Sequence, residues 1–263
     1  FARIAVVRLP RISNFTDFNA LEHLPGVALY YADRPEELSA ADLVILPGTK
    51  NTMGDLKWIR ETGMEAAILR KYGEGCFVFG VCGGFQMLGM RLSDPFGIEE
   101  GGTLRGLGLL PVETVFSREK TRTRVTGNAW VFEEWGGAKA SGFTGYEIHM
   151  GETIFSDKDA ADHKMMVQIC DQVTGESRWD GAQKKNVYGC YVHGIFDDRE
   201  VADALIGALL EEKGYGEEAM HSMDYHAYKE KQYQILANAV RENMDMKKIY
   251  EIIEKGNAAE CFI

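Results

Sequence analysis

A single cysteine stands between a strand-like run and a helix-like run in residues 78–89, which read VFGVCGGFQMLG. Glycines at positions 80, 83 and 84 surround Cys82 and let neighbouring backbone pass close to it, as at a nucleophile elbow. A thiol at the start of the following helix also lies near the positive end of the helix dipole, which favours the thiolate. The pattern predicts that Cys82 is a nucleophile. The alternative is a buried, unreactive cysteine beside a glycine-rich turn.

A thiolate nucleophile needs a base, and two of the six histidines lie at strand-like positions near glycine. His193 ends the run 187–192, where the base for an elbow nucleophile is expected, and the alternative is a structural histidine. His149 follows Glu147 by two residues, so both side chains share one face of a strand. His149 is therefore the competing candidate for the base, and the alternative is a cross-strand polar pair at a sheet edge. A metal site is the weaker alternative because no third ligand is nearby, and we predict no metal.

Apolar runs that alternate with helical patterns must position these residues. Strand-like runs occupy 4–7, 27–31, 43–46 and 76–81, with helical patterns at 18–24 and 53–72. Continuously apolar strands in β-α-β order predict a parallel sheet covered by helices on both faces. Catalytic groups of such sheets lie beyond the carboxyl ends of the strands, which is where Cys82 and the turn at Pro47 and Gly48 fall.

The second half of the chain has a different character. Glycine-rich turns separate short strand-like pieces such as 109–115 and 145–149, which predicts an antiparallel extension of the same sheet without a domain boundary. A helix is predicted at 203–212. Residues 225–253 carry apolar side chains in helical register, which indicates helices that pack on the domain edge or face a partner.

Composition limits the classes of partner. The formal net charge of −11 argues against nucleic acid or an anionic membrane as a main partner, because both require a basic surface. No apolar run approaches the ~20 residues that span a bilayer, and no signal segment opens the chain. Five cysteines without C-x-x-C spacing suit neither a disulfide framework nor a thiolate metal site. We therefore expect a soluble protein of the cytoplasm.

Four motifs together carry a family resemblance. Residues 80–86, GVCGGFQ, resemble the nucleophile elbow of class I, triad-type glutamine amidotransferases. The segments LPGTKNT (46–52), GYEIHMG (145–151) and YVHGIF (191–196) resemble, in the same order, the glutaminase domains of the cobyric acid synthase family. The resemblance implies a three-layer α/β/α, flavodoxin-like fold over residues 1–215, with a mostly parallel sheet and an antiparallel extension. It also implies that a C-terminal helical extension, residues 216–263, packs on this domain.

The family's architecture implies a partner domain. Its full-length members carry, ahead of the glutaminase domain, an ATP-dependent synthetase domain similar to dethiobiotin synthetase, and this chain holds no G-x-x-x-x-G-K-[ST] phosphate loop. Because the chain begins at Phe1, without a methionine, we expect it to be the C-terminal half of a longer protein. The resemblance implies no cofactor in this domain, with ATP and magnesium bound by the synthetase domain that this sequence lacks.

The resemblance also implies roles for individual residues. Cys82 attacks the side-chain amide of L-glutamine with His193 as acid and base, and Gln86 holds the glutamine; the alternative is that Gln86 caps the helix. The Gly83 amide and the turn at Gly48 and Thr49 stabilise the oxyanion. The alternative for Gly48 and Thr49 is an ordinary turn after a strand, without a role in catalysis. Ammonia then passes to the synthetase domain, where it amidates carboxylates of a corrinoid, adenosylcobyrinic acid a,c-diamide.

One position departs from the family of triad enzymes. Most of them have a glutamate two residues after the histidine, where this chain has Ile195. Asp197, Asp198 and Glu147 are the candidates for a third catalytic residue. Other interpretations remain open: the glutaminase domain of a cobyrinate a,c-diamide synthase or of an enzyme that amidates lipid II, a free-standing cysteine hydrolase, and a non-catalytic flavodoxin-like binding module.

Overall fold

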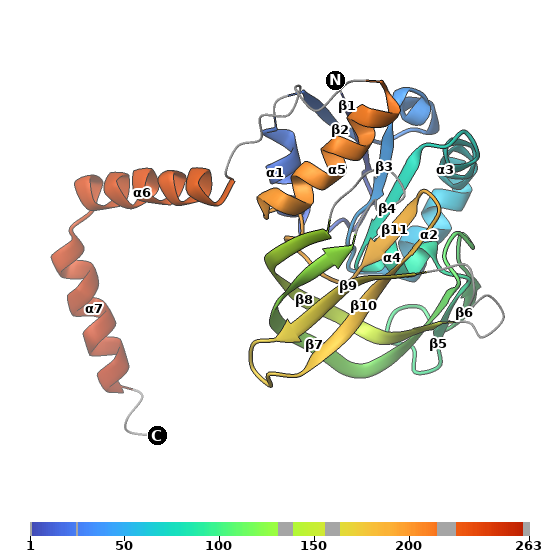
Figure 1. Ribbon diagram of the computed structural model, residues 1–263. Helices are drawn as coiled ribbons and strands as arrows, with labels where there is room; N and C mark the ends of the chain where they lie inside the picture. Colours follow the sequence, from blue (N-terminus) through green and yellow to red (C-terminus); the bar gives the residue numbers. More distant parts are fainter. Residues whose placement is uncertain (1, 25, 131–138, 156–163, 215–224, 260–263) are drawn as a thin grey trace. The chain divides into compact units, whose positions relative to one another are not determined.

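The computed structural model describes residues 2–24, 26–130, 139–155, 164–214 and 225–259. The chain divides into two compact units, Phe1–Met223 and Asp224–Ile263 (Figure 1). Every residue singled out above as a candidate for chemistry belongs to the first unit. The predicted boundary between residues 215 and 216, and the packing of the tail on the domain, remain predictions.

One sheet organises the first unit. In the part of the chain that the structure describes, eleven strands follow the order β2-β1-β3-β4-β11-β10-β9-β7-β5-β6, and β8 pairs with β7. The parallel strands are β1 (Ala2–Val7), β2 (Val27–Ala32), β3 (Leu43–Leu46), β4 (Phe77–Val81) and β11 (Val187–Cys190). The chain moves from β1 to β2 in one direction across the sheet and from β3 to β4 in the other, so right-handed crossovers place helices on both faces. The predicted α/β fold is confirmed.

The helices cover the parallel strands. They are the 3₁₀ segments η1 (Phe15–Phe18) and η2 (Pro35–Ala40), and the helices α1 (Asn19–Glu22), α2 (Thr52–Glu61), α3 (Met64–Gly73), α4 (Gly83–Leu88) and α5 (Arg199–Glu212). Helices α2 and α3 lie on one side of the sheet and α5 on the other (Figure 1). The single helix predicted over residues 53–72 is wrong, because the chain breaks at Gly63, which adopts φ 78° between α2 and α3.

An antiparallel extension continues the sheet beyond β11. Its strands are β5 (Arg91–Asp94), β6 (Gly102–Arg105), β7 (Val112–Trp130), β8 (Lys139–Phe155), β9 (Lys164–Asp171) and β10 (Ser177–Lys184). All its ladders are antiparallel except that between β5 and β7. The extension forms without a break in the sheet, as predicted, but the strand expected over residues 109–115 begins only at Val112. This region carries the GYEIHMG segment of β8 to the parallel strands.

The second unit consists of two helices, α6 (Tyr225–Asn243) and α7 (Met246–Ala259). They occupy the region in which helical register was predicted. Large apolar side chains such as Leu236 and Ile252 are more than half exposed on them. Among the described helices of the whole chain, none combines the length and the apolar character needed to cross a lipid bilayer.

Candidate active site

Cys82 occupies a tight turn between β4 and α4. Its backbone adopts φ 52° and ψ −111°, a conformation that side-chain-bearing residues rarely adopt and that is typical of a nucleophile elbow. The Cys82 amide donates to the carbonyl of Cys190 on β11, with a nitrogen–oxygen distance of 2.9 Å. The side chain is 7% exposed, so the sulfur is nearly enclosed. The geometry of the turn therefore agrees with the pattern that the sequence predicts.

The elbow depends on close backbone packing. A Cβ atom on Gly84 would lie 1.9 Å from the carbonyl oxygen of Leu46, at the end of β3. No such contact is possible between real atoms, so only glycine lets α4 begin this close to the neighbouring strand. The first turn of α4 is thereby placed beside the turn that follows β3.

His193 lies three residues beyond the end of the adjacent strand β11, and a carboxylate holds its ring. Its Nδ1 atom is 2.7 Å from Oδ2 of Asp17, and the Gly194 amide donates to the other carboxylate oxygen at 3.2 Å. The two side chains are almost completely buried. The side-chain amide of Asn14 lies 3.1 Å from Nε2 of the ring. Asp17 thus occupies the position of an orienting acid beside a catalytic histidine.

Asp17 is a residue that the sequence analysis missed. Two of the three carboxylates proposed there have other partners: Glu147 forms an ion pair with Arg178, and Asp198 accepts a hydrogen bond from the Thr144 amide at 3.1 Å. The carboxylate that accepts a hydrogen bond from the histidine ring is instead Asp17, in η1, 176 residues away in the chain. The only signal for it was that its segment follows β1, the strand beside β3 in the sheet. No local motif joins such distant residues.

Electrostatics favour a charged His193. Burial by itself lowers the pKa of the imidazole, but hydrogen bonds and opposite charge from Asp17 and Cys82 outweigh it and raise the pKa to about 10. Burial raises the pKa of the Asp17 carboxyl, while its hydrogen bond to His193 opposes that rise. The His193 ring, with the Asp17 carboxylate and the Cys82 sulfur both acting on it, is placed to exchange a proton with a reacting group at that sulfur.

Strand β8 holds His193 from the opposite side. The backbone of Tyr146 exchanges two hydrogen bonds with that of His193, with nitrogen–oxygen distances of 2.8 and 3.1 Å. The Tyr146 ring also stacks on the imidazole, with centroids 5.2 Å apart. Two residues further along β8, the Ile148 carbonyl lies 3.6 Å from the Cys82 sulfur. The GYEIHMG segment therefore closes the site over both candidate catalytic residues.

The turn after β3 packs against the elbow. A Cβ atom on Gly83 would lie 3.3 Å from the Thr49 nitrogen, and one on Gly48 would lie 3.0 Å from the His193 ring. The Thr49 hydroxyl donates to Asp55 at 2.6 Å, and Asp55 forms an ion pair with Arg11 at 3.0 Å. Backbone from the two predicted oxyanion segments is thus in contact, as a shared anion site requires.

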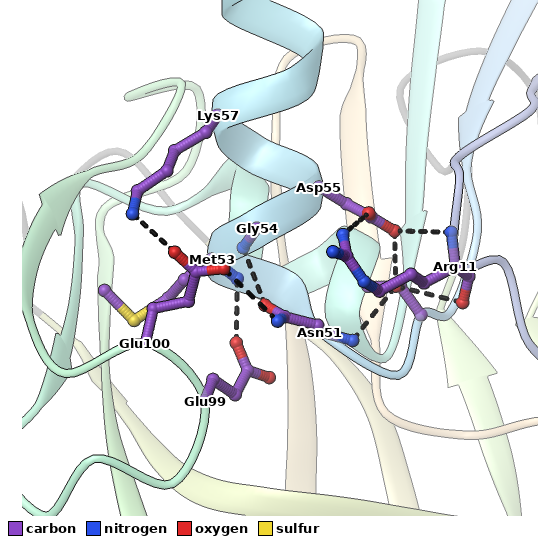
Figure 2. A network of polar contacts seen from close by, with 9 residues as sticks. Arg11, Asn51, Met53, Gly54, Asp55, Lys57, Glu99 and Glu100 are labelled. Carbon is purple, nitrogen blue, oxygen red and sulfur yellow. Dashed lines mark hydrogen bonds and ion pairs between the residues drawn. The ribbon is translucent and has the colours of Figure 1, made fainter.

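The start of α2 fixes that turn in place (Figure 2). The Asn51 side chain caps the helix by accepting from the Gly54 amide at 2.7 Å, and the Glu99 carboxylate accepts from the Met53 amide at 2.7 Å. Lys57 pairs with the neighbouring Glu100 at 2.5 Å. The loop that carries the two glutamates is therefore tied to the same helix end as the turn.

A cavity of about 410 Å³ opens in front of Cys82. Its lining includes the charged side chains of Lys50, Glu99 and Lys120. Gln86 also lines it, but the polar atoms of this side chain already have partners: Oε1 accepts from the Thr52 hydroxyl, and Nε2 donates to the Met150 carbonyl and the Tyr191 hydroxyl.

Gln86 lies inside α4, so it does not cap that helix. Its three hydrogen bonds join α4 to α2, to β8 and to the segment after β11. Its predicted role in holding a glutamine substrate stays a prediction. Among the residues that the structure describes, no group of three or more histidine, cysteine, aspartate or glutamate side chains could hold a metal ion.

The cysteines other than Cys82 lie outside this arrangement. Cys76, Cys82, Cys170 and Cys190 are free thiols, and Cys261 lies outside the described residues. Burial raises the pKa of Cys76 to about 12, and burial also raises the pKa of Cys190. Both thiols therefore stay protonated at neutral pH.

Comparisons with known proteins agree with this architecture. Residues 3–201 match the family described as the CobB/CobQ-like glutamine amidotransferase domain. A cobyric acid synthase of Ruminiclostridium cellulolyticum is 48% identical over 96% of this chain and 49% of its own length. One from Lachnoclostridium phytofermentans is 46% identical over 96% of this chain and 50% of its own length.

A solved structure supports the same fold. It is the structure of PurLQS from Thermotoga maritima, which aligns with a TM-score of 0.57 and 20% identity. The alignment covers 81% of this chain and 99% of the chain in that structure. At this identity, the likeness concerns the fold alone. The chain spans about half the length of the curated relatives that it matches.

Proposed function

Because the chain belongs to the family of CobB/CobQ-like glutamine amidotransferase domains, we propose that it hydrolyses L-glutamine at Cys82 and supplies the ammonia to an amidation reaction. One observation carries the assignment of residues. The carboxyl ends of the neighbouring parallel strands β1, β3, β4 and β11 bring Asp17, Thr49, Cys82 and His193 to one site. This is where sheets of this kind bind their ligands.

The chemistry follows from that arrangement. The Cys82 thiolate attacks the carboxamide carbon, and the negative charge that develops on its oxygen is met by the Gly83 amide and the turn at Thr49. The carbon–nitrogen bond then breaks, and the His193 imidazolium gives its proton to the departing nitrogen, so that ammonia leaves. The product left on the enzyme is a glutamyl thioester at Cys82.

The second half of the reaction needs a base instead of an acid. The Cys82 sulfur is among the groups that raise the pKa of His193 to about 10. Once that sulfur is acylated it carries no charge, so its contribution disappears and the pKa of His193 falls toward the working pH. Neutral His193 can then take a proton from the water that hydrolyses the thioester. Asp17 keeps the ring in one orientation through both steps.

The cavity suits a free amino acid. L-Glutamine carries an ammonium and a carboxylate on its α-carbon, and the cavity in front of Cys82 carries one carboxylate, Glu99, and two lysines, Lys50 and Lys120. Charged groups of both signs in the same cavity as the nucleophile favour a zwitterion with a reactive side chain. The domain itself requires no metal or cofactor for this step.

The acceptor is proposed from the relatives. Those that match at 46–48% identity are named cobyric acid synthases and are about twice as long as the matched region. We propose that the ammonia amidates carboxylates of a corrinoid, adenosylcobyrinic acid a,c-diamide, on an ATP-dependent synthetase domain of the same polypeptide. ATP and magnesium are expected to bind to that domain and not to this one.

The test is an assay of glutamate release by the purified chain. Wild type should release glutamate from L-glutamine, Cys82→Ser should release none, and His193→Ala should lower kcat by about 10³-fold or more. L-Asparagine, one methylene shorter, should react far more slowly because its amide does not reach the sulfur when its charged end is bound. Full activity in Cys82→Ser would reject the proposal.

A further inference from the structure

The Glu147 and His149 pair in β8 takes no part in the chemistry assigned above. His149 lies at the boundary between two cavities and belongs to the lining of both. The first is the cavity in front of Cys82. The second, of about 400 Å³, is lined on its other sides by Thr121, Thr153, Asp180 and Tyr191 among others, and we call it the Thr121 cavity.

The His149 ring is held in a fixed orientation. It lies flat on the ring of Tyr191, with centroids 3.7 Å apart and an angle of 16° between the planes. Its Nδ1 atom is 3.2 Å from the carbonyl oxygen of Gly151 and therefore carries the hydrogen that this contact requires. The other ring nitrogen, Nε2, is left as a hydrogen-bond acceptor.

That acceptor is buried and unused. Within the described part of the chain, Nε2 of His149 has no hydrogen-bond partner. Burial lowers the pKa of His149 to about 4, so the ring is neutral at neutral pH and its lone pair stays available. A buried polar atom without a partner is costly, which points to a ligand that supplies the missing hydrogen bond.

His149 and Cys82 line the same cavity. The Cys82 sulfur is 3.6 Å from the carbonyl oxygen of Ile148, the residue that precedes His149. Tyr191, on which His149 stacks, shares a hydrogen bond of 3.1 Å with Gln86 of α4. His149 is thus shared by the two cavities, and the Tyr191 ring on which it stacks lines the second. Beyond it, hydroxyl and carboxyl groups line the Thr121 cavity and can bind a small polar molecule.

We propose that the ammonia released at Cys82 leaves past His149 into the Thr121 cavity, with Nε2 of His149 accepting a hydrogen bond from it on the way. This inference rests on the proposed glutaminase function. At the moment of release, the glutamyl group is still bonded to the sulfur and occupies the first cavity. A second exit that carries an acceptor for N–H lets ammonia leave without passing the glutamyl group.

The test uses the reverse of the release step, because ammonia must reach the thioester along the route by which it leaves. In that step, the ammonia nitrogen attacks the thioester carbon, the carbon–sulfur bond breaks to give the Cys82 thiolate, and His193 takes a proton from nitrogen. Glutamine is regenerated. With [¹⁵N]ammonium chloride present, the recovered glutamine acquires ¹⁵N in its amide. The measured quantity is the ratio of ¹⁵N-labelled glutamine to the glutamate formed in the same time.

Two variants obstruct the route in different ways. His149→Phe keeps the stacking on Tyr191 but removes the acceptor, whereas Thr121→Trp fills the Thr121 cavity from the position opposite His149 in the β7 and β8 ladder. The control is Thr103→Trp, the same substitution at an exposed site of β6 outside both cavities. Because label is divided by hydrolysis in each sample, a loss of active protein does not alter the result.

The ratio of label to glutamate should fall about tenfold in both variants, which corresponds to about 1.4 kcal/mol in the exchange barrier, and stay at the wild-type value in Thr103→Trp. An unchanged ratio in both variants, with hydrolysis running, would overturn the route and leave the glutaminase assignment intact. Absence of label from wild-type glutamine at any ammonium concentration, with hydrolysis running, would overturn it as well. If wild type releases no glutamate, the proposed function itself fails.

Discussion

Single hydrogen bonds decide what the candidate catalytic residues can do. His193 can act on the Cys82 sulfur only while its ring is held in one orientation, and the 2.7 Å contact with Asp17 helps to hold it there. A buried carboxylate in this position also stabilises the imidazolium, which is the form that the proposed first step uses. The role of Asp17 can therefore be separated from a purely structural one by the pH dependence of turnover.

Asp17→Asn should lower kcat for glutamine hydrolysis by about 10²- to 10⁴-fold with a smaller change in KM, because the amide cannot stabilise the imidazolium. It should also move the alkaline limb of the pH profile to lower pH, since the carboxylate helps to raise the pKa of His193. Asp197→Asn is the matched control and should stay within about threefold of wild type. Equal losses in the two variants would contradict the assignment.

Asp180 gives a prediction about stability. Burial, and then the charge of Glu147, raise the pKa of its carboxyl to about 7. The pKa of this carboxyl is higher in the folded state than its ordinary value of 3.8. The free energy of unfolding of the protein therefore falls as the pH rises from about 4 to about 7. Asp180→Asn does not ionise, so its unfolding free energy relative to wild type should rise by up to about 4 kcal/mol across that window. Denaturant unfolding at pH 4, 6 and 8 measures this, and a pH-independent difference would contradict it.

Cys82 and His193 could be predicted from the sequence because each lies within a local motif. Asp17 was missed because it lies in none. Cys82 and His193 each stand at the end of an apolar run beside glycine, so local pattern and resemblance suffice to find them. Asp17 acts through tertiary contact with a residue 176 positions away. Because the expected position carries Ile195, carboxylates near it in sequence were considered first, although the acid comes from the opposite end of the chain.

At the level of elements, the site depends on how closely α4 approaches β3. Strands that are apolar throughout were predicted well, because burial on both faces leaves a continuous signal. Helix ends were predicted less well: the break at Gly63 separates two segments whose apolar spacing runs on without interruption. The short strands β5 and β6 and the full lengths of β7 and β8 were not predicted, since pairing with a neighbouring strand stabilises them and their burial does not follow a continuous apolar pattern.

Gly84→Ala tests the approach of α4 to β3. The added methyl group would meet the Leu46 carbonyl at 1.9 Å, so the helix must move, at a cost of about 1–3 kcal/mol, and glutamine turnover should fall with it. Gly73→Ala is the control, because it lies in the last turn of α3 and a Cβ there meets nothing within 4 Å. It should leave activity unchanged and stabilise the protein slightly. A fully active, equally stable Gly84→Ala would contradict the close packing.

For the molecule as a whole, the open question is the coupling between this domain and the rest of a longer protein. The proposed oxyanion turn at Gly48 and Thr49 is followed directly by the exposed Lys50, through which a partner can influence it. Glutamine turnover by this chain alone should be slow, and an added synthetase domain loaded with ATP and corrinoid should raise it about tenfold, equivalent to about 1.4 kcal/mol of coupling. Turnover that is already maximal without the partner would favour a free-standing hydrolase.

The most direct test of the central claim is to locate the nucleophile by mass spectrometry after reaction with an electrophilic diazoketone analogue of glutamine. The account predicts one equivalent of label, confined to the peptide that contains Cys82, with protection by excess L-glutamine and no label in Cys82→Ser. Stoichiometric labelling of Cys82→Ser at Cys76, Cys170 or Cys190 would contradict it, because the reactive thiol would then lie outside the site formed with His193 and Asp17.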